Sequence, residues 1–148
     1  MRVLLEAEVA PDPQNNLGIT PLQLAVQSSQ KEIVKLLVEH GSDISRTDTD
    51  GDAPIHWASG RGNKEMVRQL LELGADINAL NNRHQTALHI AIIRRDKNLV
   101  NYLLESGADL EIKTAEGNSC IDLAVTSGQK ELIELIGIIQ RRREALAD

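Results

Sequence analysis

The chain has 148 residues, which suits one domain, and with 41% apolar and 26% charged residues it belongs among soluble ordered chains. Its net charge of −6, with one Trp, one Tyr and no Phe, argues against a nucleic-acid partner, because phosphate binding needs a basic face and single strands usually stack on aromatic side chains. No apolar run reaches the roughly 18 residues of a membrane span, and the N-terminus lacks a signal-like apolar region, so we expect no membrane insertion.

The first residues already carry a period. The apolar run at positions 3–5 recurs 33 residues later, at positions 36–38. Residues 1–14 therefore resemble the end of a structural unit whose first half is missing. We interpret them as either a degenerate N-terminal cap or the tail of a unit in a longer chain.

Four versions of one hexapeptide follow at the same interval. They begin at Thr20, Ala53, Thr86 and Ser119, and the spacing is 33 residues each time. A period of this length indicates stacked supersecondary units that bury their apolar faces only against their neighbours. In three of the four, a Ser or Thr precedes Gln, His or Asp by three residues, which is the spacing of a reciprocal helix cap. Ala53 has no hydroxyl, and its helix should be capped more weakly.

A second helix is predicted in every unit. Apolar residues recur thirteen positions after each hexapeptide starts, at Ile33, Met66, Leu99 and Leu132, and continue at the spacing of one helix face. Glycines then end three of these helices, and a polar turn opens each unit. The pattern predicts an all-α solenoid of helix-turn-helix units joined by extended hairpin loops. We expect one domain over 1–148, with a part-repeat at 1–14 and repeats at 15–47, 48–80, 81–113 and 114–146.

The last outer helix, starting at Lys130, is more apolar than the end of a stack should be. A terminal unit needs a polar outer face, whereas this helix carries a dense set of Leu and Ile residues, namely Leu132, Ile133, Leu135, Ile136, Ile138 and Ile139. We expect either packing on the third unit alone or cover from a partner, a longer parent chain or a second copy. The short basic run at 141–143 is expected to be solvated, since nuclear-import clusters usually hold five to eight basic residues.

These residues resemble the ankyrin repeat family closely. Residues 32–37 read Glu-Ile-Val-Lys-Leu-Leu and residues 73–78 read Leu-Gly-Ala-Asp-Ile-Asn, almost letter for letter the family consensus. The resemblance runs from Asn15 to about Leu146. His84 and Arg95 depart from it by replacing glycines, and Cys120 by replacing proline. The resemblance implies a protein-binding scaffold that uses its hairpin tips and the exposed ends of its inner helices.

No cluster of residues predicts catalysis, a cofactor or a metal. His56 and His89 occupy equivalent helix positions about 8 to 10 Å apart, too far to share an ion that needs ligands about 2 Å away. The resemblance implies instead that they bond to the residue opening their helix and to nearby backbone. Cys120 has no expected base beside it, and we interpret it as a small buried filler. Gly60-Arg61-Gly62 lacks the strand and lysine of a nucleotide loop. We predict that the chain is not an enzyme.

The resemblance also implies which residues contact a partner protein or peptide. They are Leu17, Ile19, Asp50, Asp52, Arg61, Arg83, Gln85, Ile93, Arg94 and Glu116. Leu17 and Ile93 would supply apolar contacts, and the arginines would set orientation. Trp57 is expected to pack in the seam between inner and outer helices, with a role as a binding anchor as the alternative. One cysteine indicates a reducing compartment, the cytoplasm or the nucleus.

Two alternatives stay open. The chain could be a structural or self-associating spacer within a larger adaptor, ubiquitin-ligase component or enzyme, with its C-terminal helix as the contact. Separately, residues 70–78 resemble the Leu-x5-Asp-aliphatic-Asn pattern at which asparagine is hydroxylated in ankyrin repeats. Asn78 is then either a modification site or a hairpin residue that only forms hydrogen bonds. The identity of the partner is not readable from the sequence.

Overall fold

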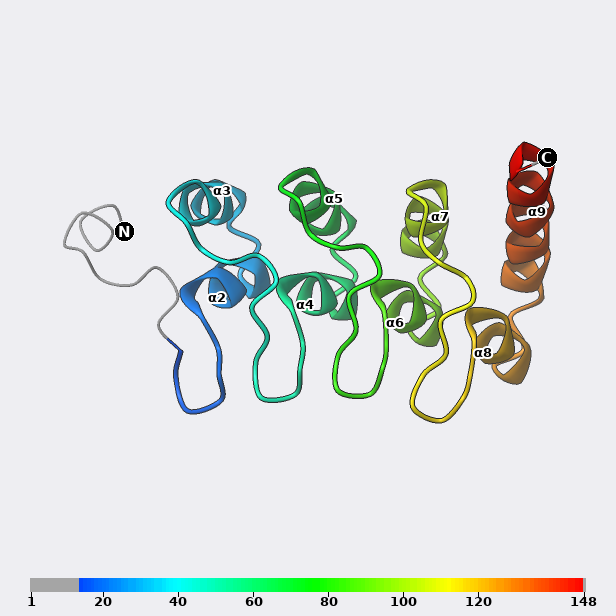
Figure 1. Ribbon diagram of the computed structural model, residues 1–148, viewed down its shortest axis with the longest axis horizontal. Helices are drawn as coiled ribbons and strands as arrows, with labels where there is room; N and C mark the ends of the chain where they lie inside the picture. Colours follow the sequence, from blue (N-terminus) through cyan, green and yellow to red (C-terminus); the bar gives the residue numbers. More distant parts are fainter. Residues whose placement is uncertain (1–13, 148) are drawn as a thin grey trace.

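The computed structural model describes residues 14–147, which contain helices and loops and no strand. The helices form four pairs, α2 (Pro21–Gln27) with α3 (Lys31–Glu39), α4 (Pro54–Gly60) with α5 (Lys64–Glu72), α6 (Ala87–Ile93) with α7 (Lys97–Glu105), and α8 (Cys120–Thr126) with α9 (Lys130–Ala147). Figure 1 shows the pairs side by side in one row, with a long loop extending from each inner helix. The predicted all-α solenoid is confirmed. The part-repeat expected at 1–14 lies outside the described residues, apart from Gln14.

Each inner helix begins where the hexapeptide pattern predicts. The side chains of Thr20, Thr86 and Ser119 accept a hydrogen bond from the backbone N–H three residues later, and the side chain at that later position accepts one in return. At Ala53 only one hydrogen bond of this reciprocal pair forms. Ala53 N–H donates to His56 Nδ1 at 2.9 Å, but Ala53 has no hydroxyl that could accept the backbone N–H of His56. The second inner helix therefore starts with an incomplete cap.

The core is a thin seam between the two helix layers. Leu22, Ile55 and Leu88 of the inner layer and Met66 and Leu99 of the outer layer are at most 1% exposed. Aliphatic side chains suffice here because each layer is only one helix deep and every pair packs on the next. Burial at a given repeat position therefore depends on whether a neighbouring pair covers it.

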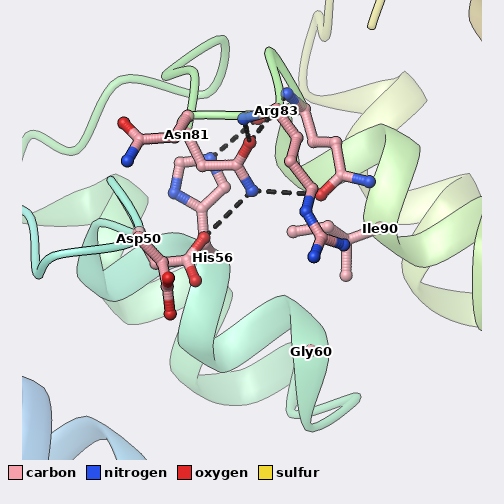
Figure 2. Close-up of a pocket in the computed structure, with 9 residues that line it drawn as sticks. Asp50, His56, Gly60, Asn81, Arg83 and Ile90 are labelled. Atoms are coloured by element: carbon pink, nitrogen blue, oxygen red, sulfur yellow. Dashed lines mark hydrogen bonds between the residues drawn. The ribbon is translucent and has the colours of Figure 1, made fainter. Parts of the chain in front are cut away.

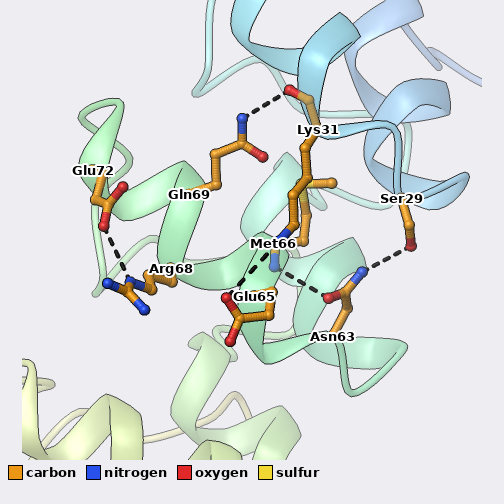
Figure 3. A network of polar contacts seen from close by, with 8 residues as sticks. All are labelled: Ser29, Lys31, Asn63, Glu65, Met66, Arg68, Gln69 and Glu72. Atoms are coloured by element: carbon orange, nitrogen blue, oxygen red, sulfur yellow. Dashed lines mark hydrogen bonds and ion pairs between the residues drawn. The ribbon is translucent and has the colours of Figure 1, made fainter.

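The outer helices are linked to one another by polar contacts (Figure 3). Gln69 Nε2 donates to the backbone oxygen of Lys31 at 2.8 Å, and Asn63 Nδ2 donates to Ser29 Oγ at 2.8 Å. Lys31 Nζ lies 3.9 Å from Glu65 Oε2, and both side chains are about half exposed. Exposed ion pairs are worth less than about 1 kcal/mol each, so this pair adds little to stability.

The same ion pair recurs further along the outer layer, with one interruption. Lys97 pairs with Glu131 one repeat on. Lys64 would meet Asn98 at the corresponding position, and its ammonium instead lies 5.6 Å from the centre of the Tyr102 ring. Each outer helix thus contacts the next through its first turn, by charge or by a cation–π contact.

The turns between paired helices need a left-handed residue, and glycine supplies it only half of the time. The φ angle is 67° at Gly62 and 69° at Gly128, but also 57° at Ser29 and 61° at Arg95. His84, in a hairpin, has φ of 55°. The departures at His84 and Arg95 therefore keep the glycine geometry, at a cost of about 1 to 2 kcal/mol each.

Helix α9 differs from the other outer helices in length and in how it ends. It has 18 residues where α3, α5 and α7 have nine, and it continues through the positions at which those helices stop. The Arg143 guanidinium donates to the carbonyl oxygens of Ala108 at 2.7 Å and Leu104 at 2.9 Å. The expectation of a solvated arginine run is thus wrong at Arg143, which satisfies carbonyls at the C-terminal end of α7. Neither α9 nor any other described helix has the length and hydrophobicity to cross a membrane.

Candidate protein-binding groove

Each hairpin loop is shaped by a polar side chain at its first turn. In the third hairpin, Asn81 Oδ1 accepts hydrogen bonds from Arg83 N at 2.9 Å and Gln85 N at 3.0 Å. Asp48 and Asn15 make the same pair of bonds in the second and first hairpins. A side-chain oxygen that holds the backbone two and four residues ahead fixes the loop without help from a partner. The first three hairpin tips are therefore held by hydrogen bonds within the chain itself.

Neighbouring hairpins are joined at their tips by one backbone hydrogen bond each. Thr49 N donates to Leu17 O at 3.1 Å, Asn82 N to Asp50 O at 3.1 Å, and Ala115 N to Arg83 O at 2.9 Å. The accepting residues, together with Glu116, occupy equivalent positions in four successive hairpins. We call this set, Leu17, Asp50, Arg83 and Glu116, the tip row.

Buried side chains of the inner helices hold the hairpins from behind. His56 Nδ1 accepts from Ala53 N, so its Nε2 carries the proton and donates to Gln85 O at 2.9 Å and Ala79 O at 3.0 Å. His89 is placed in the same way, with Nε2 donating to Ile112 O at 3.0 Å. Burial lowers the pKa of His89, which favours this neutral form. The prediction that both histidines are structural is confirmed.

A groove of about 350 Å³ lies between the second and third hairpins (Figure 2). The second hairpin contributes acidic side chains and the third contributes amides and a guanidinium, while the inner helices α4 and α6 close the back. The lining residues of this hairpin groove are Asp50, Asp52, His56, Gly60, Asn81, Asn82, Arg83, Gln85 and Ile90. Asn81 Nδ2 bridges the two hairpins, donating to Asp52 Oδ1 and Gln85 Oε1 at 3.0 Å each.

The structure brings together four of the ten predicted contact residues. Asp50, Asp52, Arg83 and Gln85 all line the hairpin groove. The others are spread along the stack, where Leu17 and Ile93 are 60% and 53% exposed, Arg61 and Glu116 are exposed, and Ile19 is half-buried.

Arg94 is partly engaged within the chain. Its Nη1 donates to Gly60 O at 2.6 Å, which links the end of α6 to the end of α4 beside the groove. Arg94 therefore keeps fewer donors for a partner, because its guanidinium already holds a backbone carbonyl. Arg61 makes no hydrogen bond or ion pair through its side chain within the described residues.

The ten predicted contact residues leave out five of the lining residues, His56, Gly60, Asn81, Asn82 and Ile90. Asn81 could have been found, because it lies 33 residues after Asp48 and 66 after Asn15. Ile90 is equivalent to Trp57, which we expected in the seam between helix layers. Trp57 is half-buried and packs against the core, as expected, and its Nε1 also donates to Asp48 Oδ2 at 3.0 Å, which links it to the second hairpin.

Three carboxylates gather in the second hairpin. Ligand oxygens of Asp48, Asp50 and Asp52 lie within 4.8 Å of one another. Asp48 Oδ1 accepts from two backbone N–H groups and Oδ2 accepts from Trp57, so its position follows from the loop and needs no ion. We assign no metal to this cluster.

The single cysteine is unsuited to nucleophilic chemistry. Cys120 is fully buried, and this burial, helped by the charge of Asp109, raises the pKa of its thiol to about 12. The thiol is therefore protonated at neutral pH, whereas a nucleophilic cysteine needs a thiolate. The interpretation of Cys120 as a small buried filler agrees with this placement.

Asn78 forms hydrogen bonds between repeats. Its Oδ1 accepts from Asp109 N at 2.9 Å, and its own N–H donates to Asp76 Oδ1 at 2.9 Å. The hydrogen-bonding role accounts for asparagine at this position. Intact-mass measurement on the chain from its native source tests the alternative, hydroxylation of Asn78.

Comparison with known proteins agrees with the repeat pattern. A family model described as ankyrin repeats in three copies matches residues 1–81 and again residues 55–138. An ankyrin repeat-containing protein of Schizosaccharomyces pombe is 35% identical over 51 residues, which make up 34% of this chain and 25% of that protein. The matched part thus spans a quarter of that relative's length.

Proposed function

We propose that this chain, which belongs to the ankyrin repeat family, is a non-catalytic module that binds one partner protein through the tip row and the hairpin groove. Repeats of this family generally bind other proteins and are typically non-catalytic. The observation that carries the proposal is the chain of hydrogen bonds that orders these tips in advance. A surface that is already ordered loses less conformational entropy on binding.

The charges of the tip row suggest the chemistry of the partner. Along the row the side chains are apolar at Leu17, acidic at Asp50, basic at Arg83 and acidic at Glu116. Neighbouring tips are on the order of 10 Å apart, the spacing of packed helices. An extended peptide rises about 3.3 Å per residue, so charges about three residues apart would meet successive tips. We expect a partner segment with a basic residue opposite Asp50 and Asp52 and an acidic residue about three positions away, opposite Arg83.

Backbone strain at His84 supports a contact at the third tip. The other three hairpins place glycine at this position, at Gly18, Gly51 and Gly117, and His84 holds the same left-handed conformation with φ of 55°. A strained residue at an exposed tip is better explained by a contact than by folding, since glycine would fold at lower cost. The imidazole of His84 lies next to Arg83 in sequence and is exposed.

Selection of peptides from a random displayed library tests this proposal. The unmodified chain should enrich sequences with opposite charges about three residues apart. Asp50→Lys with Arg83→Glu reverses both charges, and it should enrich the same spacing with the order of signs inverted. Lys35→Glu with Glu39→Lys makes matched charge changes on the exposed side of α3 and should leave the enriched sequences unchanged.

The result that contradicts the proposal is equally specific. Enrichment that is indifferent to the Asp50 and Arg83 reversal, or that responds instead to Lys35 and Glu39, would remove the tip row as the contact. A spacer role within a larger adaptor, ubiquitin-ligase component or enzyme predicts no enrichment on this face at all. Residence in the cytoplasm or nucleus stays a prediction, which fractionation of the native source tests.

A further inference from the structure

The C-terminal end of the stack exposes a surface that every earlier pair buries. At one repeat position Val26, Ser59 and Ile92 are 1%, 0% and 0% exposed, whereas Val125 is 58% exposed. The outer layer repeats the contrast, because Val34, Val67 and Val100 are fully buried and Ile133 is only half-buried. In the earlier pairs the next pair covers these positions, and at α8 and α9 no described residue does (Figure 1).

Helix α9 has two different long sides. On the side toward α7, Glu131 pairs with Lys97 and Arg142 Nη1 lies 3.6 Å from Glu105 Oε1. The rest of its exposed surface we call the end face, and its residues follow helical spacing. They are Lys130, Ile133, Glu134, Gly137, Ile138, Arg141 and Glu144. The four charged members are exposed, and their side chains make no hydrogen bond or ion pair with any described residue.

Gly137 sits in the middle of this end face without a reason inside the chain. A Cβ atom placed on it would meet no other atom within 4 Å. Glycine is among the least favourable residues in a helix interior, and the equivalent positions in earlier repeats hold Val38, Leu71 and Leu104. Its neighbour Ile138 is 45% exposed, where earlier repeats have Glu39, Glu72 and Glu105. A gap beside an exposed isoleucine suits the close approach of another helix.

We propose that the end face binds the same face of a second copy of this chain, with the two α9 helices antiparallel about a two-fold axis. The order of charge along the face is Lys130, Glu134, Arg141 and Glu144, which reads plus, minus, plus, minus. Reversing the direction of the second helix sets each charge opposite one of the other sign, while a parallel pair would set like charges together. The charge pattern thus selects a second, antiparallel copy.

The register follows from the same residues. With the axis between Gly137 and Ile138, Glu134 of each copy faces Arg141 of the second copy, and Ile138 of each lies against Gly137 of the second. Lys130 then lies near Glu144 at both ends. Such an interface is self-complementary and closes at two chains. It leaves the hairpin groove free, so this pairing does not depend on the proposed function.

The mass of the full chain in solution, followed by light scattering or sedimentation over a concentration series, tests the pairing. The unmodified chain should rise from the mass of one chain to that of two. Ile138→Glu installs the residue type that earlier repeats carry at this position, so the variant should fold, and its association should weaken by about tenfold or more. Circular dichroism confirms that helicity is kept.

A charge exchange tests the register. Glu134→Arg and Arg141→Glu should each weaken association by about tenfold, because each change spoils two symmetric contacts. The double variant should restore association, since it recreates both pairs with their signs exchanged. Local helix effects would not produce this rescue, because residues seven apart on one helix are not neighbours.

Four results would overturn the proposal. The first is a single-chain mass at every concentration, as expected when a following segment or a different partner is the natural occupant. The second is a dimer whose association is unchanged by Ile138→Glu and Glu134→Arg, and the third is a double variant whose association remains weak. The fourth is a mass above that of two chains, which would indicate head-to-tail contact with the first repeat.

Discussion

The middle and the end of this stack place equivalent residues in opposite surroundings. A Cβ atom on Gly51, in the second hairpin, would lie 2.6 Å from the backbone nitrogen of Asn82, whereas one on Gly117, in the fourth hairpin, would meet nothing within 4 Å. Val26 and Val125 differ in the same way, at 1% and 58% exposure. The repeat pattern determines which residues point toward the next repeat. Whether such a residue is buried and adds to stability depends on whether that next repeat is present.

Replacing these two glycines should give the largest contrast. Gly51→Ala should lower the free energy of unfolding by about 3 kcal/mol or more, because a left-handed alanine costs about 1 to 2 kcal/mol and overlap with Asn82 adds about 1 to 3. Gly117→Ala should cost only the first of these, since φ is 84° there and the space is open. Urea unfolding of both variants measures the difference.

Equal losses from the two glycine variants would contradict the contrast. They would mean that backbone conformation alone sets the cost and that the contact between the second and third hairpins is not rigid. The hydrogen bond from Asn82 N to Asp50 O at 3.1 Å gives the reason to expect rigidity, because Asn82 can retreat only by breaking it.

The same substitution, valine to alanine, at positions 26 and 125 should give the next largest difference in unfolding free energy. Val26→Ala should destabilise the chain by about 2 to 3 kcal/mol, because it opens a cavity between the first and second pairs. Val125→Ala should change stability by no more than about 0.5 kcal/mol, as exposed sites do. Both are measured by thermal and urea unfolding at low protein concentration. A large loss at Val125 would indicate that another surface covers it in solution.

The fold could be predicted from the sequence because the same 33-residue pattern recurs four times. A 33-residue period with Thr, Ala, Thr and Ser at the start of each inner helix determines where helices begin, and the glycines determine where they end. Even Arg95 and His84 obey the period, because the neighbouring repeats force them into the left-handed geometry that glycine adopts elsewhere. Repetition makes local exceptions harmless to the prediction.

The site could be predicted only in part, because long side chains choose partners across repeats. The positions of Asp50 and Arg83 follow from the period, and both line the groove. No spacing rule indicated that Arg94 would reach Gly60, or that Arg143 would turn back to Ala108 and Leu104. Such contacts depend on rotamers and on which carbonyls remain unpaired, and neither can be read from one sequence.

The incomplete cap at Ala53 allows a stabilising test. Ala53→Thr should raise the free energy of unfolding by about 1 kcal/mol, because a hydroxyl there would accept the N–H of His56, as Thr86 accepts that of His89 at 3.3 Å. Thr86→Ala, the reverse change one repeat later, should lower it by a similar amount. Melting temperatures of the two variants measure this. A fall on Ala53→Thr would mean that the buried site has no room for the side chain.

The smallest predicted effect is on the pH dependence of stability, through His89. Gln23, at the equivalent position of the first repeat, provides the comparison. His89 holds its place as a neutral ring, and burial lowers its pKa below the usual value of 6.5. Between pH 7.5 and 5.5 the unfolded chain therefore binds more protons at this residue than the folded chain, and stability should fall as the pH falls. The loss from this one group should be under about 1 kcal/mol at pH 6.

A variant that copies the first repeat isolates the contribution of His89. Gln23 already does at that position what His89 does, accepting from Thr20 N at 3.0 Å and donating to Asp52 O at 2.8 Å without titrating. His89→Gln should therefore fold and should show a shallower decline of unfolding free energy over the same pH range. Parallel profiles for the two proteins would mean that His89 takes up its proton without leaving its place, and that the hairpin behind it is looser than its hydrogen bonds imply.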